Sequence, residues 1–259
     1  QRAEELMQMF LDKNVKAIFC LRGGYGSIRL PPFLDYEIIQ RNPKILVGYS
    51  DVTALHLAIY KKANLVTFYG PMVALEMADP DFSSTYTCRK MLEVLTQEEP
   101  FKKVTIKGCP CGKIPPHIIT EGKTVGQLIG GYLSQIVATL GTPYEVETEG
   151  KILFFEEMGK EPYQIDCMLT QLLLAEKLQN TAGIITGEFV NCKPKGRFTR
   201  SLTLEEVLED RLAQLGIPVL TGLCFGHGKY KATLPLGVKA ALDTGEESLT
   251  ILEPAVIGQ

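Results

Sequence analysis

The sequence lacks three features that would narrow its class at once: a long apolar run, an excess of one charge and a regular set of cysteines. No apolar run reaches the roughly 18 residues that a membrane helix needs, so we expect no membrane partner. Lys and Arg number 27 and Asp and Glu 30, for a net charge of −3. Bulk charge therefore disfavours binding to nucleic acid or to an anionic membrane surface.

The seven cysteines are too few, too scattered and odd in number for the disulfide framework of a secreted protein. Free thiols in a reducing compartment are the simpler interpretation, which predicts a cytoplasmic protein. Only Cys109 and Cys111 lie close together, with His117 nearby, and no second spaced pair completes a zinc pattern. We expect neither a metal nor an organic cofactor.

What is present indicates a folded α/β protein. The chain has 259 residues, of which 45% are hydrophobic, enough for one large domain or two smaller ones. Strand-like and helix-like segments alternate in the first hundred residues, and this order favours right-handed crossovers and a parallel sheet. The expected strands are 15–21, 44–47 and 65–68, and the expected helices are 36–40 and 51–62.

The second half has a less regular order. Four prolines and little periodicity mark 98–123 as a linker between an N-terminal domain, 1–97, and a C-terminal domain, 124–259. In the latter we expect helices over 128–140, 162–175 and 204–215, strands over 152–155, 183–186 and 219–220, and a hairpin of 239–243 with 248–252.

The start of the chain predicts a preceding segment. Residues 2–12 carry an apolar face at helical spacing, formed by Ala3, Leu6, Met7, Phe10 and Leu11. A doubly wound domain normally opens with a strand before such a helix. We therefore expect a first strand upstream of Gln1.

Ser50 lies where an apolar strand ends at Gly48 and a helix begins at Asp51. A serine in a tight strand–turn–helix connection can display its hydroxyl as a nucleophile, beside the unpaired N–H groups of the helix. The alternative is a simple helix cap, which this segment taken alone favours. The usual Gly-x-Ser-x-Gly pattern is also incomplete, because Val52 occupies its last position.

A glycine-rich loop, residues 22–26, follows the first expected strand. Its glycines could present backbone N–H groups to an anion, and a tight turn is an equally good interpretation. It is neither a Walker loop nor a dinucleotide fingerprint.

A serine nucleophile needs a base and an orienting acid. His56 falls on the apolar side of a helix and His117 in the proline-rich stretch, whereas His227 lies in a glycine-flanked loop suited to displaying a catalytic side chain. Glu156 and Glu157 end an apolar strand and point to opposite faces, so only one can enter a shared site. The alternative for each is a solvated strand end.

Five motifs occur in an order that resembles the LD-carboxypeptidase (muramoyltetrapeptide carboxypeptidase) family of serine peptidases: 22–26 (RGGYG), 48–56 (GYSDVTALH), 154–163 (FFEEMGKEPY), 168–171 (MLTQ), and FGH at 225–227 followed by TLPLG at 233–237. The resemblance implies Ser50 as nucleophile, Glu156 as acid and His227 as base. It also implies an oxyanion hole from the N–H groups of Asp51 and Gly24.

The same resemblance implies an N-terminal α/β domain with a parallel sheet, a smaller, β-rich, mixed C-terminal domain, a site between them and a homodimer. The resemblance also implies a first strand and helix of the family upstream of Gln1. The expected reaction is hydrolysis of an LD bond, which trims a murein tetrapeptide to a tripeptide and D-alanine in cell-wall recycling.

Two alternatives stay open. One is the microcin immunity branch of the family, which cleaves peptidyl or aminoacyl adenylates. Its members typically stack a tryptophan on the nucleotide base of the substrate. This chain has no tryptophan, although a tyrosine could substitute. The other is a relative that binds peptides without catalysis.

Overall fold

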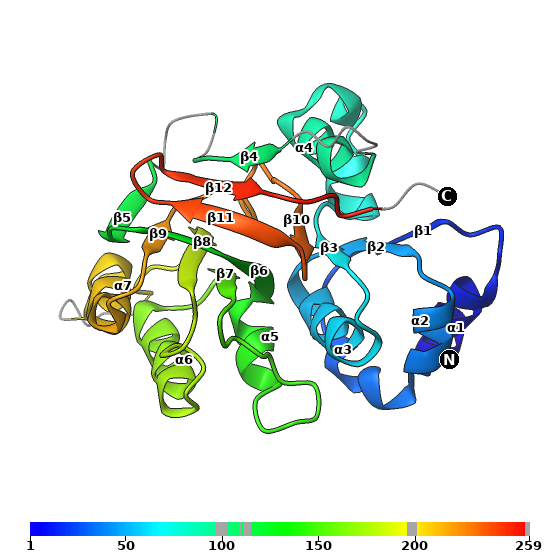
Figure 1. Ribbon diagram of the computed structural model, residues 1–259, viewed down its shortest axis with the longest axis horizontal. Helices are drawn as coiled ribbons and strands as arrows, with labels where there is room; N and C mark the ends of the chain where they lie inside the picture. Colours follow the sequence, from blue (N-terminus) through cyan, green and yellow to red (C-terminus); the bar gives the residue numbers. More distant parts are fainter. Residues whose placement is uncertain (97–102, 109, 111–114, 196–200, 257–259) are drawn as a thin grey trace.

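The computed structural model describes residues 1–96, 103–108, 110, 115–195 and 201–256, and these form two sheets flanked by helices (Figure 1). Helix α1, Arg2–Leu11, lies beside α2, Tyr36–Arg41, on the N-terminal side of the molecule. The short helical turns are η1 Ser27–Arg29, η2 Pro31–Phe33, η3 Ser50–Val52, η4 Val73–Met77, η5 Phe82–Ser84 and η6 Ala213–Leu215.

The first sheet has the strand order β1-β2-β3-β10 among the described residues. Strands β1, Ala17–Phe19, β2, Ile45–Gly48, and β3, Thr67–Tyr69, are parallel. Helix α3, Thr53–Ala63, connects β2 to β3, as a parallel pair requires. The fourth strand, β10, Leu234–Leu236, comes from near the end of the chain and pairs antiparallel with β3.

The second sheet has eight strands in the described part of the chain, in the order β4-β12-β11-β6-β7-β8-β9-β5. Its parallel centre comprises β6 Lys123–Tyr132, β7 Ile152–Met158, β8 Gly183–Val190 and β9 Val219–Thr221. Its antiparallel strands are β4 Val104–Ile106, β5 His117–Thr120, β11 Lys239–Asp243 and β12 Ser248–Ile251.

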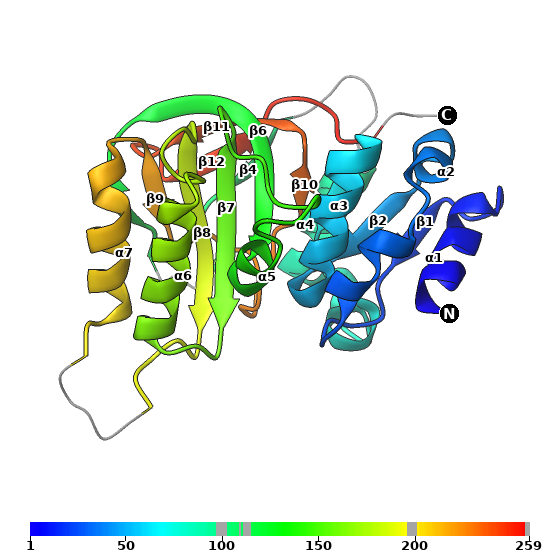
Figure 2. The same ribbon diagram turned by 90° about the horizontal axis from the view of Figure 1, so that it is seen from below.

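The parallel centre is covered on both faces. Helices α5, Leu133–Ala138, α6, Pro162–Leu174, and α7, Leu204–Leu212, lie along one face (Figure 2), while the long curved strand β6 carries β11 and β12 to the other. Helix α4, Tyr86–Leu95, lies near β4 (Figure 1). Residues Ile152 to Phe155 of β7 are fully buried, as expected for a parallel strand between two layers.

The α/β fold class is confirmed, and most expected elements occur within two residues of their predicted ends. The expected helix over 128–140 is wrong in its first part: residues up to Tyr132 complete β6, and only Leu133–Ala138 are helical. A strand buried on both faces shows no alternation, so periodicity could not distinguish it from a helix. Gly130 pairs with Phe154 of β7, and a Cβ at Gly130 would lie 1.8 Å from the carbonyl oxygen of Phe154.

The stretch expected as a linker also contains regular structure. Strands β4 and β5 fall within 98–123 and pair with β12 and β9. Both strands are short and lie at the sheet edges, so they leave little periodic signal. The C-terminal sheet is the larger one, with eight described strands against four, and β10 crosses to the first sheet. The boundaries 1–97 and 124–259 stay a prediction.

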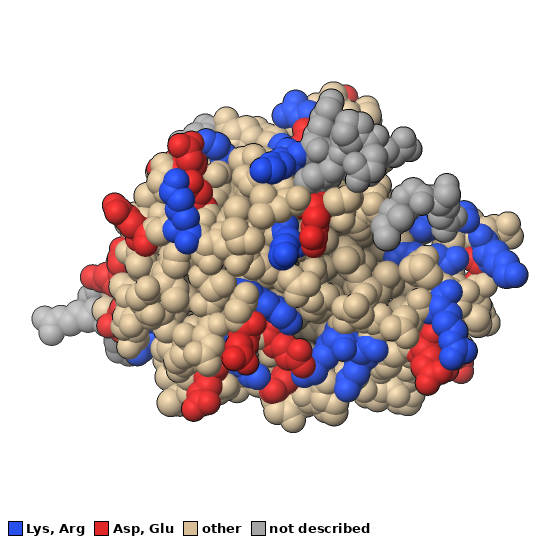
Figure 3. Space-filling view, in the orientation of Figure 1, with Lys and Arg blue, Asp and Glu red and all other residues tan. Residues whose placement is uncertain are grey.

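The surface carries mixed charge. Lys and Arg side chains are interspersed with Asp and Glu side chains over the face shown in Figure 3. Among the described residues no helix combines the length and apolarity needed to cross a membrane.

Candidate active site

Ser50 occupies a sharp turn between β2 and the helical turn η3. Its φ is 63°, a left-handed conformation that a residue with a side chain adopts at a cost in energy. No side chain caps this helical turn, so the helix-cap interpretation of Ser50 is wrong. The Ser50 hydroxyl instead lies within hydrogen-bond distance of His227.

The imidazole of His227 lies between Ser50 and Glu156. Its Nε2 is 3.0 Å from Ser50 Oγ, and its Nδ1 is 2.9 and 2.8 Å from the two carboxylate oxygens of Glu156. The His227 side chain is only 10% exposed. A carboxylate can only accept, so Nδ1 carries the proton and Nε2 is left to accept the hydroxyl proton of Ser50.

Glu156 is fully buried near the end of β7, where an isolated carboxylate would be costly. Gly226, with a φ of 90°, lets the loop that carries His227 approach it: a Cβ at Gly226 would lie 2.4 Å from Glu156 Cγ. The glycine next to His227 therefore permits the close contact between His227 and Glu156.

Tyr69 also contacts this group, a contact that the sequence analysis did not predict. Its hydroxyl donates to Glu156 Oε1 at 2.5 Å and accepts from the backbone N–H of Ser50 at 3.2 Å. Burial, and then the charge of Glu156, raise the pKa of Tyr69 well above its usual value. The only available signal was its position at the end of β3, beside the end of β2 that precedes Ser50.

Of the two residues expected to form an oxyanion hole, Asp51 lies in the Ser50 turn and Gly24 in the glycine-rich loop after β1. Asp51 follows Ser50 directly, and its buried carboxylate accepts from Ser27 N at 2.9 Å and from Gln135 Nε2 at 2.8 Å. This bonding holds the 22–27 loop against the turn. A Cβ on Gly23 would lie 3.2 Å from Ser50 Oγ, and Gly24 follows with a φ of 121°. The roles of Asp51 and Gly24 stay predictions.

A buried ion pair supports the His227 loop from the other side. Lys231 Nζ lies 3.1 Å from Glu76 Oε1 and donates to the carbonyl of Gly228 at 2.5 Å. Glu76 also accepts from the hydroxyl of Tyr49, whose ring packs edge-on against His227 at 5.0 Å between centroids. Lys231 and Glu76 are far apart in sequence, so local sequence patterns could not predict this ion pair.

The alternative interpretation of Glu157, a solvated strand end, is wrong. Glu157 is fully buried, on the side of β7 opposite to Glu156. Ser134 donates to its Oε2 from the backbone N–H at 2.9 Å and from the hydroxyl at 2.7 Å. Burial raises the pKa of Glu157, and the hydrogen bonds from Tyr132 and Ser134 partly oppose that rise. The expected opposite orientation of the two glutamates agrees with these partners.

The two other histidines lie outside this group. His56 is fully buried, as expected for a core residue, and its Nε2 contacts the carbonyl of Gly48 at 2.9 Å. Burial lowers the pKa of His56 to about 4. His117 lies on β5 and bonds to Glu209 at 2.8 Å.

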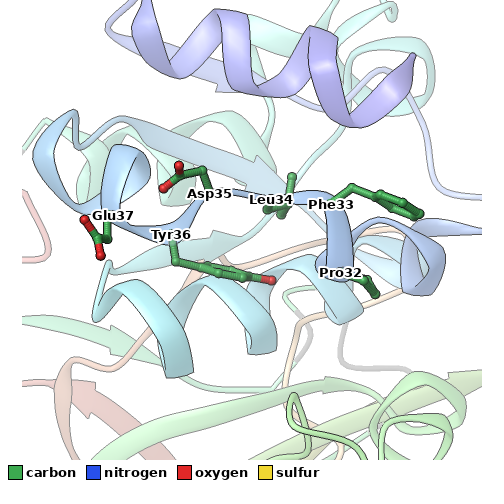
Figure 4. Close-up of a pocket in the computed structure, with 6 residues that line it drawn as sticks. All are labelled: Pro32, Phe33, Leu34, Asp35, Tyr36 and Glu37. Atoms are coloured by element: carbon green, nitrogen blue, oxygen red, sulfur yellow. The ribbon is translucent and has the colours of Figure 1, made fainter.

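Other possible sites do not overlap with the Ser50 group. Cys109 and Cys111 lie outside the described residues, and the described His, Cys, Asp and Glu side chains form no cluster that could hold a metal. A separate hollow of about 640 Å³ is lined by residues 32–37 (Figure 4). None of Ser50, Glu156 and His227 borders it.

The arrangement can support nucleophilic catalysis. A hydroxyl on a strained turn, an imidazole at hydrogen-bond distance and a buried carboxylate behind that imidazole are the parts that a serine hydrolase needs. The fold brings these groups together from positions 50, 156 and 227, and two of them belong to the larger sheet and its loops.

Comparison with known proteins identifies the family. Residues 1–70 match the LD-carboxypeptidase N-terminal domain, and residues 125–242 match the LD-carboxypeptidase C-terminal domain. The chain is 41% identical over 251 residues to a probable murein peptide carboxypeptidase of Bacillus subtilis (strain 168), covering 97% of this chain and 76% of that protein. The chain therefore belongs to the LD-carboxypeptidase family.

Solved structures agree with this assignment. A muramoyltetrapeptide carboxypeptidase from Oxalobacter formigenes superposes with a TM-score of 0.83 at 31% identity, covering 96% of this chain and 82% of the other. The microcin C7 self immunity protein MccF, in complex with aspartyl sulfamoyl adenosine, gives a TM-score of 0.85 at 30% identity, with coverages of 99% and 81%. Both branches of the family are thus represented among the relatives.

Proposed function

We propose that this protein is a serine-type LD-carboxypeptidase that releases D-alanine from a murein tetrapeptide. The observation that carries the proposal is the continuous hydrogen-bonded path from Ser50 through His227 to Glu156. Membership of a carboxypeptidase family supports the reaction class, and similarity to the probable murein peptide carboxypeptidase of Bacillus subtilis supports a murein peptide as substrate.

The proposed reaction needs only side chains and water. Ser50 Oγ attacks the carbonyl carbon of the scissile bond while its proton moves to His227 Nε2, and Glu156 holds the Nδ1 proton. The N–H groups of Asp51 and Gly24 are assigned to the developing oxyanion. The imidazolium then gives its proton to the amine of the departing D-alanine, and water hydrolyses the acyl-enzyme by the same path.

Hydrolysis of paired synthetic peptides tests the proposal. The purified protein is incubated with tetrapeptides that end in D-alanine after lysine or diaminopimelate, and free alanine is measured by mass spectrometry. We expect release from the D-alanine peptides, none from the matched peptides that end in L-alanine, and none with Ser50→Ala. Equal cleavage of both diastereomers would contradict an LD-specific reaction.

The adenylate branch supplies a second candidate. MccF, a structural relative, is described in complex with aspartyl sulfamoyl adenosine, and in this chain Tyr49 and Tyr132 lie against the His227 ring, at 5.0 and 5.2 Å between centroids. The absence of tryptophan favours the murein reaction. Competition decides between them: an aminoacyl sulfamoyl adenosine inhibits an adenylate-cleaving enzyme far more strongly than a murein tetrapeptide does.

A non-catalytic peptide binder is the remaining rival. A fluorophosphonate reagent reacts rapidly only with an activated serine, so rapid labelling of Ser50 supports an enzyme and its absence supports a binder. We also propose that the protein acts in the cytoplasm, in cell-wall recycling, and as a homodimer. Cell fractionation tests the location, and light scattering tests the assembly.

A further inference from the structure

Tyr69 is buried at the centre of the proposed active site. It is the last residue of β3, is 1% exposed, and contacts the rings of Phe154 and His56 edge-on. Its hydroxyl contacts Ser50 N and Glu156 Oε1 at 3.2 and 2.5 Å. A residue of the first sheet is thereby hydrogen-bonded to the carboxylate of the second.

The direction of both hydrogen bonds is fixed by chemistry. The N–H of Ser50 can only donate, so the phenol oxygen accepts there, and the single phenol proton points to Glu156. Burial and the neighbouring carboxylate raise the pKa of Tyr69, so the phenol keeps this proton at any physiological pH. The hydroxyl is therefore a permanent donor to Glu156.

We propose that Tyr69 is a positioning residue that couples the nucleophile turn to the acid of the catalytic group. This inference rests on the proposed function. Through one oxygen, Tyr69 fixes the backbone at the strained residue Ser50 and orients the carboxylate that holds His227. It also draws part of the Glu156 charge away from the imidazole, because a hydrogen bond to a carboxylate stabilises its charged form.

Tyr69→Phe removes this hydroxyl and leaves the ring in place. We expect kcat to fall about 10- to 100-fold, the range for loss of a hydrogen bond to a charged group, while KM changes less than about threefold. Without the phenol proton, Glu156 attracts the imidazolium more strongly, so the acid limb of kcat/KM moves to higher pH. Tyr36→Phe is the matched control, since the Tyr36 hydroxyl on α2 donates to the carbonyl of Pro31 at 2.7 Å and also bonds to Tyr144, and neither partner belongs to the Ser50 group.

Two further measurements separate positioning from packing. Titration with a fluorophosphonate counts active sites, so kcat is expressed per correctly folded molecule. Replacing Tyr69 by 3-fluorotyrosine gives a stronger donor and is expected to move the acid limb the opposite way, to lower pH. A loss in Tyr69→Phe that disappears per titrated site, or an unchanged acid limb, would overturn the proposal in favour of a packing role.

A separate measurement distinguishes failure of the proposed function from failure of the proposed role of Tyr69. An NMR titration of His227 needs no substrate, and its midpoint is expected to move to higher pH in Tyr69→Phe. If the wild type neither labels nor cleaves but this shift occurs, the proposed function is wrong and the coupling is right. If the wild type is active and the His227 titration is unchanged in Tyr69→Phe, the coupling is wrong.

Discussion

The two faces of the sheet at the end of β7 each contain one fully buried glutamate. On the side facing the first sheet, Glu156 is fully buried and bonds to His227 and Tyr69. On the side facing α5 and α6, Glu157 is equally buried and bonds to Ser134 and the backbone of Met158. Only the first carboxylate has a titratable base as partner. The comparison shows that burial alone does not distinguish the proposed catalytic carboxylate from its neighbour, whereas the chemistry of their partners differs.

The largest effect on turnover is expected from replacing the proposed nucleophile, which lies on the Glu156 side of β7. Ser50→Ala is expected to reduce turnover by at least about 10⁴-fold, because no other described hydroxyl lies against His227 Nε2. The free energy of unfolding should change by less than about 2 kcal/mol, since the serine makes no capping bond. Product release and chemical denaturation check both parts. Near-normal turnover would show that Ser50 is not the nucleophile.

A comparison of histidines comes next. His227→Ala is expected to be as inactive as Ser50→Ala, with a normal fold, because it removes the base. His56→Ala should mainly lose stability, since it empties a fully buried position on α3. Activity per folded molecule and thermal unfolding of the two variants decide the matter. The opposite result, an essential His56 and a dispensable His227, would exclude the proposed triad.

The acid is expected to give a smaller but still large effect. Glu156→Gln keeps the shape and removes the charge that fixes the His227 tautomer, so we expect a loss of about 10³- to 10⁴-fold in kcat with little change in KM. Steady-state kinetics with the murein tetrapeptide measures it. A loss no greater than that of Glu157→Gln would mean that the acid lies elsewhere.

Glu157→Gln provides the matched control on the other side of β7, and its kcat should stay within about tenfold of the wild type. The main effect of Glu157→Gln is expected on the stability of the fold. Because burial raises the pKa of Glu157, the folded state holds the proton more tightly than the unfolded state does, and stability falls as pH rises from the ordinary glutamate range through the raised pKa. Glu157→Gln should flatten this dependence, as measured by denaturation across that range. An unchanged pH profile of stability would contradict the assignment.

The sequence predicted those features that depend on neighbours in the chain. The turn at Ser50 and the opposite orientation of Glu156 and Glu157 follow from a strand that ends in a helix and from strand alternation. The burial of Glu157 was missed, because it depends on Ser134, which precedes it by a whole strand connection. Tyr69 was missed for the same reason, since its hydroxyl bonds to Ser50 in the turn after β2 and to Glu156 on β7, both far from it in the chain.

The family resemblance supplied what local patterns could not. Glycines beside His227 indicated a displayed loop, but only the fold shows that Gly226 makes room for the carboxylate of Glu156. The end of β6 was misassigned as helix, because the core of a parallel sheet and the core face of a buried helix have the same apolar composition. Sheet pairing joins residues that are far apart in the chain. A single sequence does not reveal which strands become neighbours in the sheet.

The place of β10 in the first sheet has a consequence for synthesis of the chain. The ribosome makes β3 early and its antiparallel neighbour, Leu234–Leu236, near the end. Until then one edge of the nascent first sheet is unpaired, and an unpaired edge invites pairing with other chains. His227 leaves the ribosome in the same late stretch. The pairing of this edge and the contact of His227 with Glu156 are therefore completed together, so a polypeptide that ends before His227 has an open sheet edge and lacks the proposed base.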